Sequence, residues 1–161
     1  MKRFSIGSLI LALLIPLLVG GISASLSAKG MAMYGNMNKP PLSPPAWVFS
    51  VAWTILYIMM GVASYLIVAS EVDNRTKAMA LIVYGLQLFM NFMWSIVFFN
   101  LGAYLFAFVW LIIMWFIVIL CIFRFAGINR AAAYMMLPYI LWLTFAAYLN
   151  FGAYLLNAKG K

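Results

Sequence analysis

The chain has 161 residues, of which 68% are hydrophobic and 7% are charged, and its mean hydropathy is +1.11. Soluble domains carry roughly 25% charged residues, so this composition excludes a soluble globular protein. The formal net charge is +8, but the cations lie between or outside the apolar segments and form no basic cluster, so nucleic acid is not expected as a partner.

The first apolar segment, residues 4–28, follows two cations, Lys2 and Arg3. A positively charged start, an apolar segment and the small residues 20–25 also describe a secretory signal peptide, which is the alternative here. The apolar segment is long for a signal peptide, whose apolar region has roughly 7–15 residues. We therefore predict that it forms a first transmembrane helix.

A proline-rich loop opens the second segment, where Pro40, Pro41, Pro44 and Pro45 fill four of six positions. Proline fixes φ near one value and has no N–H group, so this stretch is held extended and cannot be helical. An uncharged aromatic helix follows directly. The sequence therefore predicts a rigid lid at a membrane face, leading into a second span.

The third charge-free stretch, residues 78–123, is too long for one span, because a single helix would extend about 70 Å across a hydrocarbon core of roughly 30 Å. Asn100 and Gly102 tolerate the left-handed backbone that ends a helix, so we place a turn at Asn100-Leu101-Gly102. The predicted fold is an all-α membrane protein, a single domain built as a bundle of five transmembrane helices, at about residues 4–26, 45–69, 78–99, 103–124 and 131–156.

Cations outside the five spans set the expected orientation. The face with the amino terminus carries six and the opposite face four, so the positive-inside rule favours a cytoplasmic amino terminus and an external proline-rich loop. We expect an integral, multi-pass protein in contact with lipid, in a bacterial cell membrane. The two sets are Lys2, Arg3, Arg75, Lys77, Arg124 and Arg130, and Lys29, Lys39, Lys159 and Lys161.

Acids, bases and metal ligands are nearly absent from the apolar segments. The sequence has no His, and its two carboxylates, Glu71 and Asp73, lie in the loop between the second and third spans. A proton-coupled pump or a zinc membrane protease needs such groups inside the membrane, so neither is expected, and no metal site is predicted. Cys121 lies in an apolar helix and is expected to be a small buried hydrophobe.

Aromatic and amide residues recur every third or fourth position on three predicted helices, which places them on one face of each. For the amides, hydrogen bonding between helices and lining of a ligand pocket are equally open. Together, three such faces predict a pocket for a large, flat, mostly apolar ligand with a few polar edges. The faces are Phe49, Trp53 and Tyr57; Gln87, Asn91, Trp94 and Phe98; and Tyr139, Trp142, Ala146 and Asn150.

Three motifs occur in order along the chain: Lys39 to Gly61, Gln87 to Phe99, and Pro138 to Asn150. Together they resemble the tryptophan-rich sensory protein family, TspO, whose animal member is the mitochondrial translocator protein or peripheral benzodiazepine receptor. The resemblance covers about residues 34–157. It implies a five-helix membrane protein, commonly a homodimer. The four-residue spacings Gly20–Ala24 and Ala103–Ala107 offer weak candidate contacts for such a dimer.

The resemblance also implies a ligand class. Family members bind porphyrins such as protoporphyrin IX and haem, and some bind sterols and benzodiazepine-type ligands. They are regarded as sensors, regulators or carriers linked to tetrapyrrole metabolism. We therefore expect a porphyrin-binding sensor or regulator that requires no cofactor of its own. Lys29 and Lys39 are the cations nearest the predicted pocket mouth, where acidic groups of a ligand would lie, although both are also typical interface anchors.

The expected ligand-binding residues combine the family positions with two further residues, the loop-proximal Tyr34 and the amide Gln87. Met33 and Leu42 stand where many members carry tryptophan, which is expected to weaken contact between the loop and a flat ligand. The full set is Tyr34, Trp47, Trp53, Tyr57, Gln87, Asn91, Trp94, Tyr139, Trp142, Phe145, Ala146 and Asn150.

Two other functions remain open. Some bacterial members degrade protoporphyrin in light, and Trp53 and Trp142 match the tryptophans concerned, so a photo-oxidative enzyme is one alternative. A porphyrin or sterol transporter is the other. Carriers often contain internal repeats or broken helix pairs, and neither is evident in this sequence.

Overall fold

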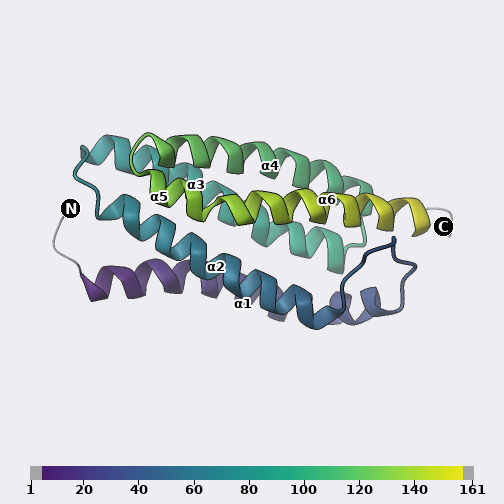
Figure 1. Cartoon of the computed structure of the whole chain (residues 1–161). Coiled ribbons are helices and arrows are strands. Elements are labelled where there is room, and N and C mark those ends of the chain that lie inside the picture. The colour runs from purple at the N-terminus through teal and green to yellow at the C-terminus, as the bar shows by residue number, and fades with distance from the viewer. Residues whose placement is uncertain (1–4, 158–161) are drawn as a thin grey trace.

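The computed structural model describes residues 5–157, which form helices joined by loops. The helices lie side by side along one axis (Figure 1). The elements are α1 (Ile6–Gly35), α2 (Ala46–Val68), α3 (Asn74–Ser95), the π-helical η1 (Ile96–Asn100), α4 (Tyr104–Ala126), α5 (Arg130–Met135) and α6 (Leu137–Asn157).

Five segments of the described chain are long and apolar enough to cross a membrane, with α3 and η1 forming one segment and α5 and α6 another. The five-helix membrane fold predicted from the sequence is confirmed. Phe4, where the first predicted span begins, and the terminal cations Lys2, Arg3, Lys159 and Lys161 lie outside the described residues. The orientation of the bundle stays a prediction.

Helix α1 extends nine residues beyond the predicted end of the first span and stops at Gly35. Lys29 does not end the helix, because its side chain is exposed on the helix surface, where a long charged side chain can reach water. At the end, the Asn36 N–H group donates to the Met33 carbonyl at 3.0 Å, and the Met37 N–H group donates to the Tyr34 carbonyl at 3.3 Å. Tyr34 therefore sits on the last turn of a helix, close to the proline-rich loop.

The predicted turn between the third and fourth spans is present, with Gly102 in the left-handed region at φ 59°. The π-helical turn η1 precedes it and holds an additional residue per turn, which rotates Phe98 and Phe99 relative to the face of α3. The Asn100 side chain donates from Nδ2 to the Leu26 carbonyl on α1 at 2.9 Å. The end of the third span is thereby attached to α1.

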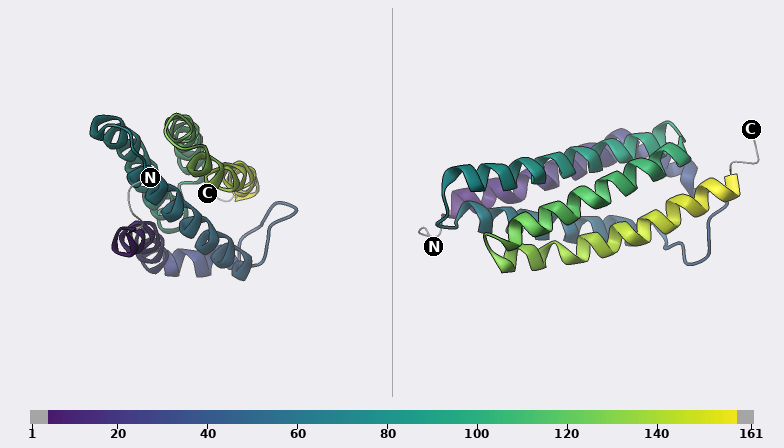
Figure 2. Two further views of the ribbon diagram at one scale, coloured as in Figure 1. Left: turned by 60° about the vertical axis from the view of Figure 1, so that its left-hand side comes forward. Right: turned by 90° about the horizontal axis from the view of Figure 1, so that it is seen from above.

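The fifth span is divided into α5 and α6 at the turn residue Met136. Pro138 explains the division, since it has no N–H group to donate to the Tyr134 carbonyl and its ring crowds that carbonyl. The chain continues as α6 along the bundle (Figure 2). Tyr139, immediately after the proline, has no exposed surface.

The loop between α2 and α3 is shorter than predicted, because α3 begins at Asn74 and not near residue 78. Asp73 is the N-cap, and its carboxylate accepts hydrogen bonds from the Thr76 N–H and hydroxyl groups. These bonds from Thr76 hold the pKa of Asp73 below its ordinary value. Lys77 extends back from α3 and donates to the Val68 carbonyl at 3.2 Å, at the last residue of α2.

Small residues allow close contact between helices within the chain. A Cβ atom at Gly61 would lie 2.8 Å from the Leu13 Cα atom, and one at Gly20 would lie 2.2 Å from the Tyr57 ring. Ala107 has no exposed surface and belongs to the main core. Gly20 and Ala107, expected as dimer contacts, therefore serve packing within one chain. A homodimer stays a prediction that these two positions do not support.

Candidate ligand-binding site

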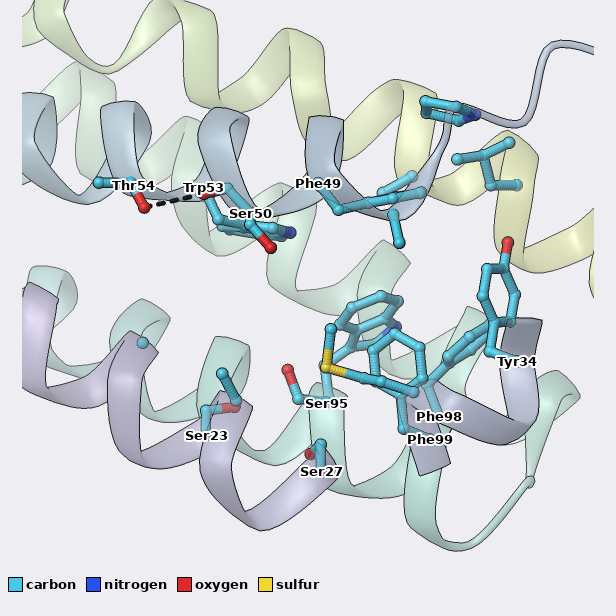
Figure 3. Close-up of a pocket in the computed structure, with 18 of the residues that line it drawn as sticks. Ser23, Ser27, Tyr34, Phe49, Ser50, Trp53, Thr54, Ser95, Phe98 and Phe99 are labelled. Atoms are coloured by element: carbon cyan, nitrogen blue, oxygen red, sulfur yellow. Dashed lines mark hydrogen bonds between the residues drawn. The ribbon is translucent and has the colours of Figure 1, made fainter. Parts of the chain in front are cut away.

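A cavity of about 340 Å³ lies between α1, α2, the α3–η1 segment and the proline-rich loop, with α6 contributing to its wall. Figure 3 shows the α2 residues facing those of α1 and the α3–η1 segment across this space. Its size lies within the roughly 300–1,000 Å³ range typical of small-molecule pockets. The three aromatic faces predicted from the sequence contribute to this cavity to different extents.

One face of α2 forms the wall opposite α1. The residues that line the cavity recur at helical spacing, which keeps them on one side of the helix. Trp47 is one position out of this series; it is 68% exposed and does not line the cavity. The series includes two predicted site residues, and its members are Ala46, Phe49, Ser50, Trp53, Thr54 and Tyr57.

Trp53 and Tyr57 form a stacked pair on this wall, with ring centroids 5.5 Å apart and an interplanar angle of 27°. The Tyr57 hydroxyl donates to Oδ1 of Asn91 at 2.6 Å, which ties the tyrosine to α3. Because Tyr57 is fixed at its hydroxyl end and packs on Gly20 with its ring, it provides a rigid support for the Trp53 indole.

Three of the predicted site residues are buried inside the bundle and do not line the cavity. They are Asn91, Tyr139 and Gln87. Nδ2 of Asn91 donates to the Tyr139 hydroxyl at 3.1 Å, so this amide links α2, α3 and α6. Nε2 of Gln87 lies 3.9 Å from the Met60 sulfur, and its Oε1 has no partner among the described residues. The sequence left two roles open for Asn91, hydrogen bonding between helices and lining of a ligand pocket. In this structure Asn91 forms hydrogen bonds between helices.

Trp94 lines the cavity from α3 and is fixed at the N–H edge and at one face of its indole ring. Its Nε1 donates to Oδ1 of Asn150 on α6 at 3.2 Å, and Nδ2 of Asn150 donates to the Tyr104 carbonyl at 2.8 Å. Its ring stacks on Phe98, with centroids 5.2 Å apart. Asn150 and Ala146 line the cavity from α6, so these predicted residues lie together with Trp94.

Trp142 and Phe145 lie outside the cavity, on a groove between α2 and α6 at the outer surface of the bundle. Trp142 packs edge-on against Trp53, with centroids 6.4 Å apart, and against Phe49 at 5.8 Å. It therefore supports the α2 wall from behind. Direct contact between Trp142 and a ligand in the cavity, as the sequence predicted, would require a movement of Trp53.

Apart from Tyr34, the α1 wall was missed by the sequence reasoning, although α1 supplies more small residues to the cavity than any other helix. The lining residues between positions 20 and 27 are all small, and the lack of large side chains there creates the space beside α2. The available signal was a cluster of Gly, Ala and Ser in an otherwise large-residue apolar helix. The α1 residues that line the cavity are Leu17, Gly20, Gly21, Ser23, Ala24, Ser27, Met31, Tyr34 and Gly35.

The proline-rich loop covers one end of the cavity and is held against α6. The Pro41 carbonyl accepts a hydrogen bond from the Tyr148 hydroxyl at 2.8 Å, and the Asn38 carbonyl accepts one from Asn157 at 2.9 Å. Pro40 is buried against Gly152, where an added Cβ atom would lie 2.6 Å from the proline ring. The predicted lid is therefore docked on the carboxyl-terminal half of α6.

At the mouth under this loop, Tyr34 and Lys39 line the cavity. Nζ of Lys39 donates to the Gly35 carbonyl at 3.0 Å and lies 5.2 Å from the centroid of the Tyr34 ring. Lys29, the other cation considered at the mouth, does not line it. Met33 and Leu42, the two positions at which weaker contact with a ligand was expected, are 71% and 81% exposed and also lie off the cavity.

The comparisons with known proteins agree with this architecture. A model of the TspO/MBR family matches residues 12–155, which include α2 to α5 in full and most of α1 and α6. A tryptophan-rich protein TspO from Archaeoglobus fulgidus is 36% identical over 153 residues, covering 93% of this chain and 97% of that protein.

Two further relatives are similar to this chain over about three quarters of its length. A tryptophan-rich sensory protein from Cereibacter sphaeroides is 36% identical over 124 residues, covering 77% of this chain and 76% of that protein. A translocator protein from the sheep, Ovis aries, is 34% identical over 125 residues, covering 76% of this chain and 73% of that protein. This chain is therefore an integral, multi-pass membrane protein that belongs to the TspO/MBR family.

Proposed function

We propose that this protein is a membrane sensor or regulator that binds a porphyrin, such as protoporphyrin IX or haem, in the cavity between α1, α2 and the α3–η1 segment. The observation that carries this proposal is the pair of aromatic walls. Trp53 and Tyr57 stack on α2, while Trp94 and Phe98 stack on the α3–η1 segment, and both pairs line the same cavity. Stacked indole, phenol and phenyl rings suit a large, flat, aromatic ligand.

Binding is preferred over catalysis because of the groups on the cavity wall. The ionisable side chains among the described lining residues are Lys39, Tyr34 and Tyr57, and the Tyr57 hydroxyl is engaged by Asn91. Proteins usually perform general acid–base chemistry with His, Asp or Glu side chains, and none of these lies among the described lining residues. The name of the Cereibacter sphaeroides relative, a tryptophan-rich sensory protein, is consistent with a sensing role.

Transport is the second candidate, and the names of the translocator proteins from sheep and cattle support it. A carrier needs two access states. The loop that covers the cavity is held on α6 through two carbonyl groups, those of Asn38 and Pro41, and release of these contacts would open that end. Sensing remains the preferred proposal, because stacked and hydrogen-bonded walls favour one fixed arrangement.

Lys39 offers a direct test of the ligand class, since porphyrins of this kind carry two carboxylates. A ligand stacked between the aromatic walls would place its acidic edge at the mouth, where the Lys39 ammonium group lies. At low salt, Lys39→Gln is expected to weaken protoporphyrin IX binding by about two- to fivefold, the size of a solvent-exposed ion pair. Binding of protoporphyrin IX dimethyl ester, which has no carboxylates, should not change.

Titration of protoporphyrin IX and its dimethyl ester into the purified protein in nanodiscs, followed by tryptophan fluorescence, measures both effects. Lys29→Gln is the matched control, because it removes an exposed lysine of α1 that does not line the cavity. An equal loss of affinity for the acid and the ester in Lys39→Gln would argue against a carboxylate at the mouth. An absence of saturable binding by either compound would refute the proposed function.

A further inference from the structure

Two serines on the α1 wall stand out because their hydroxyl groups are buried and unpaired. Ser23 is 2% exposed and Ser27 has no exposed surface, and both residues line the cavity. Neither Oγ atom has a hydrogen-bond partner among the described residues. A buried hydroxyl without a partner lowers stability, so such groups are uncommon in proteins and call for an explanation.

Other serine and threonine side chains in these helices show how a hydroxyl is normally satisfied in an apolar setting. Four of them donate to a carbonyl three or four residues earlier in their own helix. Ser25, on the same helix as Ser23 and Ser27, donates to the Gly21 carbonyl at 2.9 Å. The same pattern holds on other helices for Thr54, Ser64 and Thr144. Ser23 and Ser27 depart from it.

The two hydroxyls belong to one polar side of the cavity. Ser23 and Ser27 are four residues apart and so share a face of α1. Figure 3 places Ser95 of the α3–η1 segment beside them and shows Phe49 and Trp53 across the cavity on α2. Along α1, they lie about 10–16 Å from Tyr34 at the mouth, at 1.5 Å per residue. The serines therefore lie well away from Lys39.

We propose that Ser23 and Ser27 form a hydroxyl subsite that hydrogen-bonds an uncharged polar group, a hydroxyl or a carbonyl, on the inner edge of the ligand. The proposal rests on the proposed function and specifies the ligand further. A serine hydroxyl both donates and accepts, so it fits either group. A charged group does not fit there, because the lining cation, Lys39, is at the other end of the cavity and a charge in an apolar setting needs a partner.

Three flat probes of similar size separate this subsite from stacking alone: pyrene, 1-pyrenemethanol and 1-acetylpyrene. Binding to the protein in nanodiscs is measured by quenching of tryptophan fluorescence for the natural sequence, for Ser23→Ala, Ser27→Ala and the double variant, and for Ser25→Ala as the control. The ratio of the Kd for pyrene to that for each polar probe is compared between variants, which cancels the partitioning of the probes into lipid.

For the double variant, the preference for at least one polar probe is expected to fall by about fivefold, the effect of losing one hydrogen bond, while the Kd for pyrene is unchanged. Ser25→Ala should keep the preference of the natural sequence. The single variants should each show part of the loss. Because alanine removes a buried unpaired hydroxyl and favours the helix, the unfolding temperature of the ligand-free double variant is expected not to fall.

An unchanged preference in the double variant, with normal pyrene binding, would overturn the subsite. So would a lower unfolding temperature of the ligand-free double variant, because it would assign the hydroxyls a structural role. If protoporphyrin IX still binds in either case, the proposed function survives and only the subsite fails. If neither the pyrene probes nor protoporphyrin IX bind the natural sequence, both proposals fail together.

Discussion

Trp53→Ala is expected to weaken protoporphyrin IX binding by about 10- to 100-fold. The substitution removes the indole that lines the cavity from α2 and leaves the Tyr57 ring without its stacking partner. Loss of one aromatic stacking surface, together with its buried area, is worth about 1.5–3 kcal/mol. Titration in nanodiscs, followed by the change in the porphyrin absorbance, gives the two dissociation constants. Trp53→Phe should retain most of the affinity.

Two further tryptophan substitutions serve as comparisons for Trp53→Ala. Trp115→Ala removes an α4 indole that donates to Thr144 on α6 and does not line the cavity, so it should leave the affinity unchanged. Trp142→Ala removes the indole behind Trp53, so its effect should be smaller than that of Trp53→Ala. If Trp142→Ala weakens binding more than Trp53→Ala does, the ligand lies in the outer groove and the assignment of the cavity is wrong.

The second large effect is expected on stability. In Gly30→Ala the new Cβ atom would lie 2.2 Å from the Phe99 carbonyl oxygen and 2.4 Å from its carbon. These are backbone atoms, so α1 must move away from η1, which costs about 1–3 kcal/mol of unfolding free energy. The same movement widens the cavity between Ser27 and Phe99 and should weaken ligand binding as well. Unfolding in detergent, followed by circular dichroism, measures the loss.

Gly85→Ala is the control for the helix propensity that alanine brings. Nothing lies within 4 Å of a Cβ atom at Gly85, so this variant should gain about 0.5–1 kcal/mol. A variant Gly30→Ala that is as stable as Gly85→Ala would show that α1 and η1 do not make the close contact described above.

Much of the fold follows from the sequence alone, because hydrophobic length and charge position determine where helices cross a membrane. The five spans and the turn at Gly102 are examples. The end of α1 was placed too early because Lys29 was taken as a boundary, although a lysine side chain can extend from a helix to the membrane surface. The π-helical turn η1 has no evident sequence signal and depends on contacts such as that between Asn100 and Leu26.

The site was harder to predict than the fold. Helical spacing identifies which residues share a face, and it brings Trp53, Tyr57 and Trp94 to the cavity. It cannot tell a face that lines a cavity from one that packs in the core, which is why Asn91 and Tyr139 were grouped with them. Most of the α1 wall was missed because its small residues were interpreted only as a signal-peptide feature or as contacts between helices.

A cavity-filling substitution tests the central claim, that a porphyrin binds between α1 and α2, most directly. Ala24 lines the cavity, whereas Ala28, one turn further along α1, is exposed and does not line it. Saturable protoporphyrin IX binding, at one molecule per chain, is expected for the natural sequence and for Ala28→Trp, and Ala24→Trp is expected to abolish it. If the Ala24→Trp variant binds protoporphyrin IX as tightly as the natural sequence does, the claim is contradicted.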